Sequence, residues 1–180
     1  PGGRGADKCE RCFQCVELCP AAAREMMGKW FTVEALTALV LKDRIYYETS
    51  GGGVTASGGE AMIWPDFLAA FFARLKQEGI HTALDTSAVV GGDKLRAVLE
   101  HTDLALVDLK IMDPARHLEI IGVPLPPILN NIKEINAFPT PLILRVPVIP
   151  GYTDAEANLR AIAAFARELS GLQFVDLLPY

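Results

Sequence analysis

Residues 50–60 have the sequence Ser-Gly-Gly-Gly-Val-Thr-Ala-Ser-Gly-Gly-Glu, in which two glycine clusters flank a short apolar segment. Glycine lacks a Cβ and adopts positive φ angles, so each cluster marks a sharp turn or a close approach of the backbone. An aromatic-rich pattern with helical spacing follows Glu60. The segment therefore predicts a strand, a glycine loop and a helix. In parallel α/β folds, ligands bind at this carboxyl end of the strand.

Two well-known glycine motifs do not match this segment. A dinucleotide-binding fingerprint needs G-x-G-x-x-G, but after Gly51 and Gly53 the third glycine position is Ala56. A phosphate-binding loop needs lysine after its last glycine, whereas Glu60 follows Gly59. The remaining structural alternative is that the glycines only form turns around a strand.

Strand-like and helix-like segments alternate along the rest of the chain. Such alternation is typical of consecutive right-handed βαβ units and a parallel sheet. Apolar strand-like runs start near Val54, Ile80, Leu104, Leu142 and Phe174. Helices are predicted over residues 21–27, 33–47, 67–78 (capped by Asp66), 94–101, 114–120, 128–137 and 158–169.

Polar residues stand at or near the carboxyl ends of the predicted strands. They are Glu60, Asp85, Asp108, Lys110 and Arg145. In a barrel or half-barrel these ends form one rim, so the side chains are expected to converge on one ligand. Structural alternatives exist for each of them. Asp85 or Ser87 could cap the next helix, while Asp108 and Lys110 could pair. Arg145 could form an ion pair at the rim.

All four cysteines lie in one short run with the spacing C-x2-C-x2-C-x3-C-P. This is the spacing of bacterial ferredoxins that bind a [4Fe–4S] cluster. Zinc sites use C-x2-C pairs with a longer spacer, and disulfide scaffolds spread their cysteines. We therefore predict a ferredoxin-like segment over residues 1–28 and an α/β domain over 29–180. The candidate metal ligands are Cys9, Cys12, Cys15 and Cys19, although in two-cluster ferredoxins the fourth cysteine binds the other cluster.

The composition narrows the classes of function. The chain has 180 residues, of which 51% are hydrophobic, and a formal net charge of −5. An acidic chain without basic runs argues against binding to nucleic acid or to a membrane surface. No apolar run is long enough to span a membrane, and the N-terminal residues lack the apolar core of a signal peptide. These features predict a soluble, cytoplasmic protein.

Taken together, the motifs resemble those of the activating enzymes of glycyl radical enzymes, within the radical S-adenosylmethionine (SAM) superfamily. Besides the cysteine run, the resemblance rests on residues 50–60, Leu-Asp-Thr-Ser at 84–87, Val-Asp-Leu-Lys at 107–110, Leu-Arg-Val-Pro-Val-Ile-Pro-Gly at 144–151 and Leu-Leu-Pro-Tyr at 177–180. The cysteine run is similar to the insert found in the subgroup with extra clusters.

The resemblance implies an activity. In this family a [4Fe–4S] cluster with one open iron binds the amino and carboxylate groups of SAM. Reduction, with flavodoxin or ferredoxin as the expected reductant, cleaves SAM to a 5′-deoxyadenosyl radical. The radical takes a hydrogen atom from a glycine of the partner glycyl radical enzyme.

The resemblance also implies a set of SAM-binding residues. They are Ser57, Gly58, Gly59, Glu60, Asp85, Asp108, Lys110 and Arg145. The backbone of residues 57–60 and the Glu60 carboxylate would hold the methionyl amino group. Asp108 and Lys110 would contact the ribose or the carboxylate, and Asp85 would form a cation site with Thr86.

The sequence also departs from the family pattern. The three-cysteine loop C-x3-C-x2-C of the catalytic cluster and the strand before it are absent, and Ala88 replaces a family glycine. The expected fold is a partial (β/α)6 barrel without its first strand, from the middle of a longer protein and inactive alone. Two alternatives stay open, namely an iron–sulfur electron-transfer module on a (β/α) scaffold and a non-radical (β/α) enzyme with an accessory cluster.

Overall fold

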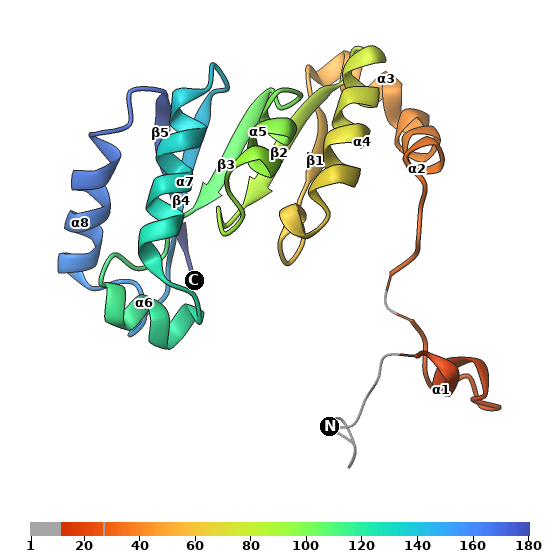
Figure 1. Cartoon of the computed structure of the whole chain (residues 1–180), viewed down its shortest axis with the longest axis horizontal. Helices are drawn as coiled ribbons and strands as arrows, with labels where there is room; N and C mark the ends of the chain where they lie inside the picture. The colour runs from red at the N-terminus through yellow and green to blue at the C-terminus, as the bar shows by residue number, and fades with distance from the viewer. Residues whose placement is uncertain (1–11, 27) are drawn as a thin grey trace. The chain divides into compact units, whose positions relative to one another are not determined.

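A computed structural model describes residues 12–26 and 28–180 (Figure 1). The chain divides into two compact units, residues 1–32 and 33–180, so the division falls a few residues after the predicted boundary at residue 28. In the first unit, α1 spans Gln14–Glu17. The helix predicted over residues 21–27 is wrong for the described part, residues 21–26. Ala22 has a φ of 47°, and the amide of Ala23 donates to the Cys19 sulfur instead of to a helical carbonyl.

The second unit contains a five-stranded sheet with the order β1-β2-β3-β4-β5. Every pair of neighbouring strands is parallel. The sequence-based prediction of an α/β fold with a parallel sheet is therefore confirmed. The strands are β1 (Gly53–Ala56), β2 (His81–Thr86), β3 (Leu104–Asp108), β4 (Leu142–Val148) and β5 (Leu172–Pro179).

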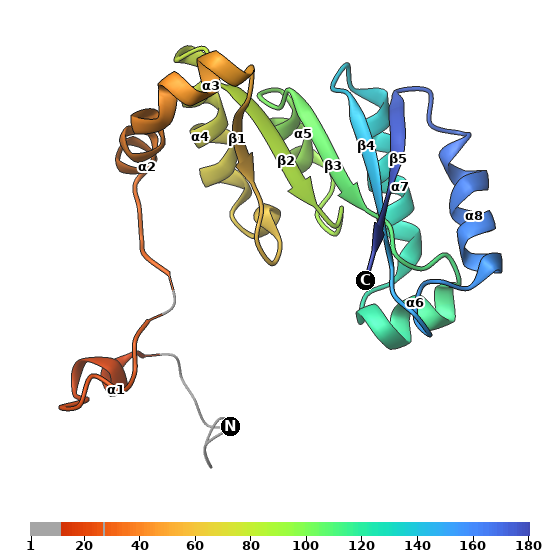
Figure 2. The same cartoon turned by 180° about the vertical axis from the view of Figure 1, so that it is seen from behind.

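Helices connect the strands, and α4, α5 and α7 lie together on one face of the sheet (Figures 1 and 2). The helix predicted over residues 33–47 is interrupted by a 3-10 turn, η2. The helical elements are α2 (Val33–Val40), η2 (Leu41–Asp43), α3 (Arg44–Ser50), η3 (Ala61–Ile63), α4 (Pro65–Gln77), α5 (Asp93–Leu99), α6 (Pro114–Ile121), α7 (Leu125–Ala137) and α8 (Glu156–Ala166). Among the described residues, no helix is both long and apolar enough to cross a membrane.

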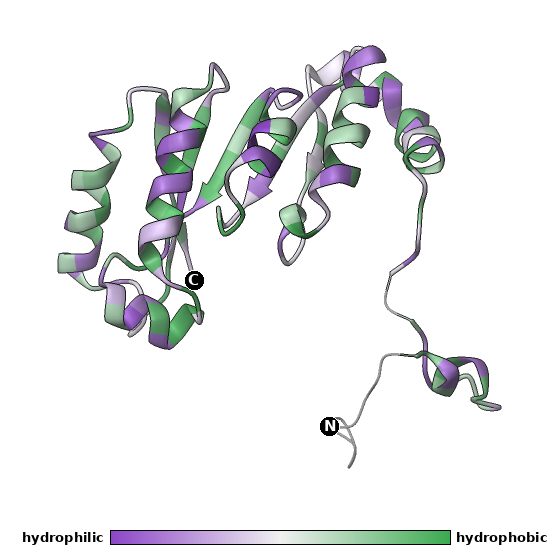
Figure 3. Ribbon diagram, in the orientation of Figure 1, coloured by the Kyte–Doolittle hydropathy of each residue, from purple (hydrophilic) through white to green (hydrophobic). Residues whose placement is uncertain are grey.

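Alternating burial along the strands separates a core face from a site face. In β3, Ala105 and Val107 are fully buried, whereas Asp108 is only partly buried. Successive side chains of a strand point to opposite faces, so Asp108 lies on the face opposite to these core residues. The strands are largely hydrophobic, as Figure 3 shows for β3 and β4. The core supports the strands from one side and leaves polar residues on the other.

One predicted helix cap is wrong, and one cap considered as a structural alternative does not form. Asp66 lies in the first turn of α4, which begins at Pro65 and has Trp64 at its N-cap position. Proline suits the first helical position because its missing amide would have no partner there, and the Asp66 charge still complements the helix dipole. Neither Asp85 nor Ser87 caps the next helix, because α5 follows Gly92 without a side-chain cap.

Candidate functional site

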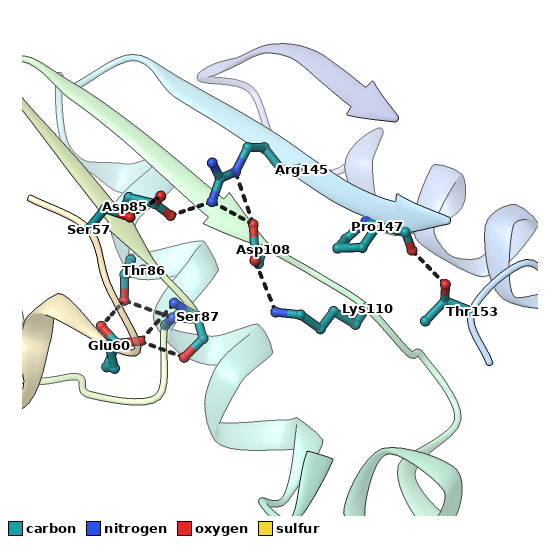
Figure 4. A network of polar contacts seen from close by, with 11 residues as sticks. Ser57, Glu60, Asp85, Thr86, Ser87, Asp108, Lys110, Arg145, Pro147 and Thr153 are labelled. Carbon is teal, nitrogen blue, oxygen red and sulfur yellow. Dashed lines mark hydrogen bonds and ion pairs between the residues drawn. The ribbon is translucent and has the colours of Figure 1, made fainter. Parts of the chain in front are cut away.

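Charged side chains from three adjacent strands meet at the carboxyl edge of the sheet (Figure 4). Asp85 lies near the end of β2, Asp108 ends β3, and Arg145 lies in β4. Asp108 and Arg145 are register partners in the β3–β4 pair. The carboxyl ends of parallel strands share one edge, which is why residues far apart in the sequence come together here.

A continuous network of polar contacts joins these residues. Arg145 Nη2 contacts Asp85 Oδ1 and lies 2.8 Å from Asp108 Oδ1, to which Arg145 Nε also donates at 3.0 Å. Lys110 Nζ donates to Asp108 Oδ2 at 3.0 Å. Ser57 Oγ donates to Asp85 Oδ2 at 2.8 Å. We call these five residues the rim network. Both structural alternatives are therefore observed, since Asp108 pairs with Lys110 and Arg145 forms ion pairs at the rim.

The rim network balances its charges internally. Its two carboxylates and two cations have side chains that are 16–30% exposed. Partly buried charges need partners, because an unpaired one loses its hydration without compensation. A ligand that carries both an ammonium and a carboxylate can exchange partners with this set and leave no charge unpaired. The donor and acceptor set therefore suits a zwitterion.

Glu60 has a different environment from the other acidic residues of the edge. Its Oε1 accepts from the Met62 amide at 2.9 Å and from Thr86 Oγ1 at 2.7 Å. Its Oε2 accepts from the Ser87 amide at 2.9 Å and from Ser87 Oγ at 2.6 Å. A carboxylate has about four acceptor sites. The side chain therefore ties the glycine loop to the end of β2, and any ligand contact of this carboxylate would compete with these bonds.

Asp85 and Thr86 are not brought together by their side chains. Thr86 is buried and its hydroxyl is bonded to Glu60, whereas Asp85 faces Arg145. Neighbouring residues of a strand point to opposite faces, so the two side chains cannot form one site without a change in the strand. The cation site implied by the resemblance stays a prediction.

The two glycines before Glu60 have unequal roles in the loop. Gly58 has a φ of 135°, which L side chains rarely adopt, whereas a Cβ on Gly59 would meet nothing within 4 Å. Both residues are exposed. The backbone at Gly58 therefore requires glycine, while Gly59 has room for a side chain.

A cavity of about 200 Å³ adjoins the rim network. His117 lines it and is 3% exposed, with Nδ1 lying 2.8 Å from the Val123 carbonyl. A carbonyl only accepts, so Nδ1 of His117 is the donor in this contact. Sequence reasoning missed this residue, which lies inside a predicted helix with no motif around it. The cavity is lined by Ser87, Val89, Asp108, Lys110, His117, Ile121, Val123 and Ile128.

A larger cavity of about 460 Å³ is lined by residues of α6, α8 and the segments before them. Ala155, Ala157 and Ala161 form part of its wall, and no residue of the rim network does. Size alone does not mark a binding site, which also needs convergent polar groups. We therefore place the candidate site at the rim network and its smaller cavity.

Three of the four predicted metal ligands fall within the described residues, while Cys9 lies outside them. Within residues 12–26 and 28–180, no three histidine, cysteine or acidic side chains gather closely enough to hold a metal ion. The cluster site therefore stays a prediction. The pKa of Cys19 is lowered, because amides after it donate to its sulfur, first that of Ala23 at 3.3 Å and then that of Ala21. Such amides favour the thiolate, the form that binds metal.

The comparisons of this sequence with known proteins point to a single family. The profile of the Radical SAM superfamily matches residues 14–161. The isethionate sulfite-lyase activating enzyme of Nitratidesulfovibrio vulgaris is 39% identical over 175 residues, which cover 96% of this chain and 56% of that protein. The (2S)-3-sulfopropanediol dehydratase activating enzyme of Klebsiella oxytoca is 40% identical over 96% of this chain and 55% of its own length. The chain thus spans little more than half the length of these two relatives.

Solved structures agree with the sequence comparison. A domain of the pyruvate-formate lyase-activating enzyme from Bacteroides vulgatus matches with a TM-score of 0.67 and 37% identity, over 72% of this chain and 81% of that one. Streptococcus suis SuiB, bound to its precursor peptide, matches with a TM-score of 0.66 over 88% of this chain and 35% of that one. At 13% identity, SuiB shows the shared fold alone.

Proposed function

The chain belongs to the radical SAM superfamily, and from this premise we propose that it serves as an activating enzyme of a glycyl radical enzyme, with SAM bound at the rim network. The observation that carries the proposal is the balanced set of two carboxylates and two cations at the carboxyl edge. Relatives that are 39–40% identical over nearly the whole chain are named as activating enzymes. In this family, SAM bound to a [4Fe–4S] cluster supplies the radical.

The residues of the rim network fit the amino-acid end of SAM. The carboxylates of Asp85 and Asp108 would accept hydrogen bonds from its amino group, and the cations of Lys110 and Arg145 suit its carboxylate. Ser57 would orient Asp85 through the hydrogen bond at 2.8 Å. The exposed backbone of Gly58 and Gly59 would approach the amino group, and Glu60 would hold that backbone in place. This chain would therefore bind and orient SAM.

An apolar rim around the site supports a protein as the hydrogen donor. Its six side chains lie in the segments that follow β1, β2, β3 and β4, and they are 36–63% exposed. Large apolar side chains exposed beside a site favour contact with another protein. A glycine-bearing loop of a partner glycyl radical enzyme fits this surface. The apolar rim consists of Ile63, Trp64, Val89, Leu118, Ile121 and Tyr152.

The cysteine run supplies the second part of the proposal. Cys9, Cys12, Cys15 and Cys19 would hold a [4Fe–4S] cluster, and the amides that favour the Cys19 thiolate support that role. Such a cluster would pass electrons from flavodoxin or ferredoxin toward the SAM site. Chemistry of this kind suits the cytoplasm, where thiols stay reduced.

The proposal is tested by titrating the 180-residue chain with SAM in a calorimeter under anaerobic conditions. Asp108→Asn removes the charge that links Arg145 to Lys110 and should weaken SAM binding about tenfold, or 1.4 kcal/mol. The matched control is Glu168→Gln, because Glu168 forms a pair with Lys133 at 3.0 Å, as Asp108 does with Lys110. Equal affinities in all three proteins, or no binding by the unmodified chain, would contradict the proposal.

A further inference from the structure

The turn that follows β2 holds an unfavourable backbone conformation. Ala88 is completely buried and has a φ of 57°. An L residue in this left-handed region crowds its Cβ against the following carbonyl. Such conformations persist only where the surroundings hold them, and they concentrate at functional sites. The contacts that hold Ala88 in this conformation therefore indicate the role of the turn.

Asn131 of α7 supplies one of these contacts. Its Nδ2 donates to the Ala88 carbonyl at 2.8 Å. Gly91 makes room for the amide, since a Cβ at that position would lie 2.0 Å from Asn131 Oδ1. On the other side of the turn, the Ala88 amide donates to Thr86 Oγ1 at 3.0 Å. The turn is thus fixed from α7 and from β2.

The Ala88 turn also fixes the glycine loop, residues 57–60. Thr86 and Ser87, the two residues before Ala88, together supply three of the four hydrogen bonds that Glu60 accepts. Glu60 directly follows Gly58 and Gly59 in the sequence. A continuous series of contacts therefore runs from Asn131 through the strained turn to the backbone proposed to meet SAM.

We propose that Asn131 is a positioning residue for the SAM-binding loop, acting through the Ala88 turn and Glu60. The inference rests on the proposed function for the identity of the ligand. Without the Asn131 amide, Ala88 has one restraint fewer and relaxes toward the common φ range. Ser87 then moves away from Glu60, the glycine loop loses its support, and the affinity for SAM falls.

The same helix offers a matched control. Asn136 Oδ1 accepts from the Gly171 amide at 2.7 Å, and Gly171 lies just before β5, at the amino edge of the sheet. A Cβ on Gly171 would lie 3.2 Å from Asn136 Oδ1. Both asparagines are partly buried, and each holds a loop through one side-chain amide. Only Asn131 is connected to the glycine loop.

The test compares Asn131→Ala and Asn136→Ala in the 180-residue chain by hydrogen exchange and by SAM titration. Asn131→Ala should speed amide exchange across residues 57–64 and weaken SAM binding about tenfold, whereas Asn136→Ala should change neither. Adding Ala88→Gly to the Asn131 variant should restore both values, because glycine adopts the turn without strain. Asn131→Asp, which keeps the shape but loses the donor, serves if the alanine variant does not fold.

The outcomes separate the two proposals. Unchanged exchange at residues 57–64 in both Asn131 variants, or no rescue by Ala88→Gly, would overturn the positioning role. Faster exchange that glycine rescues, in a chain that binds no SAM, would support the positioning role and refute SAM as the ligand.

Discussion

The two edges of the sheet both contain carboxylate–cation pairs, but their carboxylates have different partners. At the amino edge, Asp103 pairs with Lys76, and its Oδ2 accepts the backbone amide of Thr82 at 2.9 Å. At the carboxyl edge, Asp85 and Asp108 are bonded to side chains of Ser57, Arg145 and Lys110.

The difference shows which edge serves the fold and which is available to a ligand. A backbone amide at the start of β2 has a fixed position, so Asp103 stabilises the chain connection between β2 and β3. Side chains can exchange partners without disturbing the backbone. Asp85 and Asp108 at the carboxyl edge therefore suit binding, whereas Asp103 at the amino edge suits stability.

The largest effect expected from this contrast is on the free energy of unfolding. Asp103→Ala leaves the Thr82 amide and Lys76 without their acceptor, and should destabilise the chain by about 2 kcal/mol. SAM affinity should stay unchanged, because Asp103 lies at the opposite edge. Urea unfolding and SAM titration measure the two quantities. If Asp103→Ala unfolds like the unmodified chain but binds SAM poorly, the amino edge serves binding and not stability, and the contrast is wrong.

A smaller effect is expected within the glycine loop. Gly58→Ala forces a side chain onto a φ of 135° and should cost about 1–2 kcal/mol, partly as distortion of the loop. Gly59→Ala meets open space and should change stability by less than about 0.5 kcal/mol. Thermal unfolding and SAM titration of the two variants provide the comparison. Equal losses in both would show that the loop conformation does not depend on Gly58.

The smallest expected effect is the pH dependence of the free energy of unfolding. Burial by itself would raise the pKa of Asp103, but the hydrogen bonds from Lys76 and the Thr82 amide outweigh it and lower the pKa below its ordinary value. The folded state then binds the proton less tightly than the unfolded state. The stability from Asp103 is present above a pH of about 4 and is lost as the pH falls through the folded pKa.

Urea unfolding between pH 6 and pH 3, taken as working limits around the ordinary carboxyl pKa, measures this dependence. Asp103→Asn should remove part of the loss seen in acid, because asparagine does not titrate. Identical pH profiles for the two proteins would show that Asp103 is not linked to folding.

Much of the fold was predictable because it depends on local patterns. The strand predicted to start near Leu142 does begin there, since an apolar run interrupted only by Arg145 marks β4. The helix over residues 21–27 was mispredicted, because helical spacing alone does not reveal the contact between Ala23 and Cys19. The break at η2 had no local signal either.

The site was predictable only in part. The shared direction of parallel strands places Asp85, Asp108 and Arg145 at one edge, and their contacts confirm that they converge. The convergence predicted for Glu60 is not observed, because its carboxylate binds the end of β2 instead. The sequence suggested an ion pair of Arg145 but not its partners, because the Arg145–Asp85 contact joins positions 60 residues apart. The contact between Asn131 and Ala88 spans 43 residues and follows no motif.

The sequence by itself therefore determined the alternation of strands and helices, the parallel sheet and the residues that reach its carboxyl edge. These follow from periodicity and from the shared direction of parallel strands. Only the tertiary structure decided that Glu60 binds the end of β2 while Asp108 faces two cations. Each carboxylate takes the donors that packing brings within hydrogen-bond distance, and most of those donors come from distant parts of the chain.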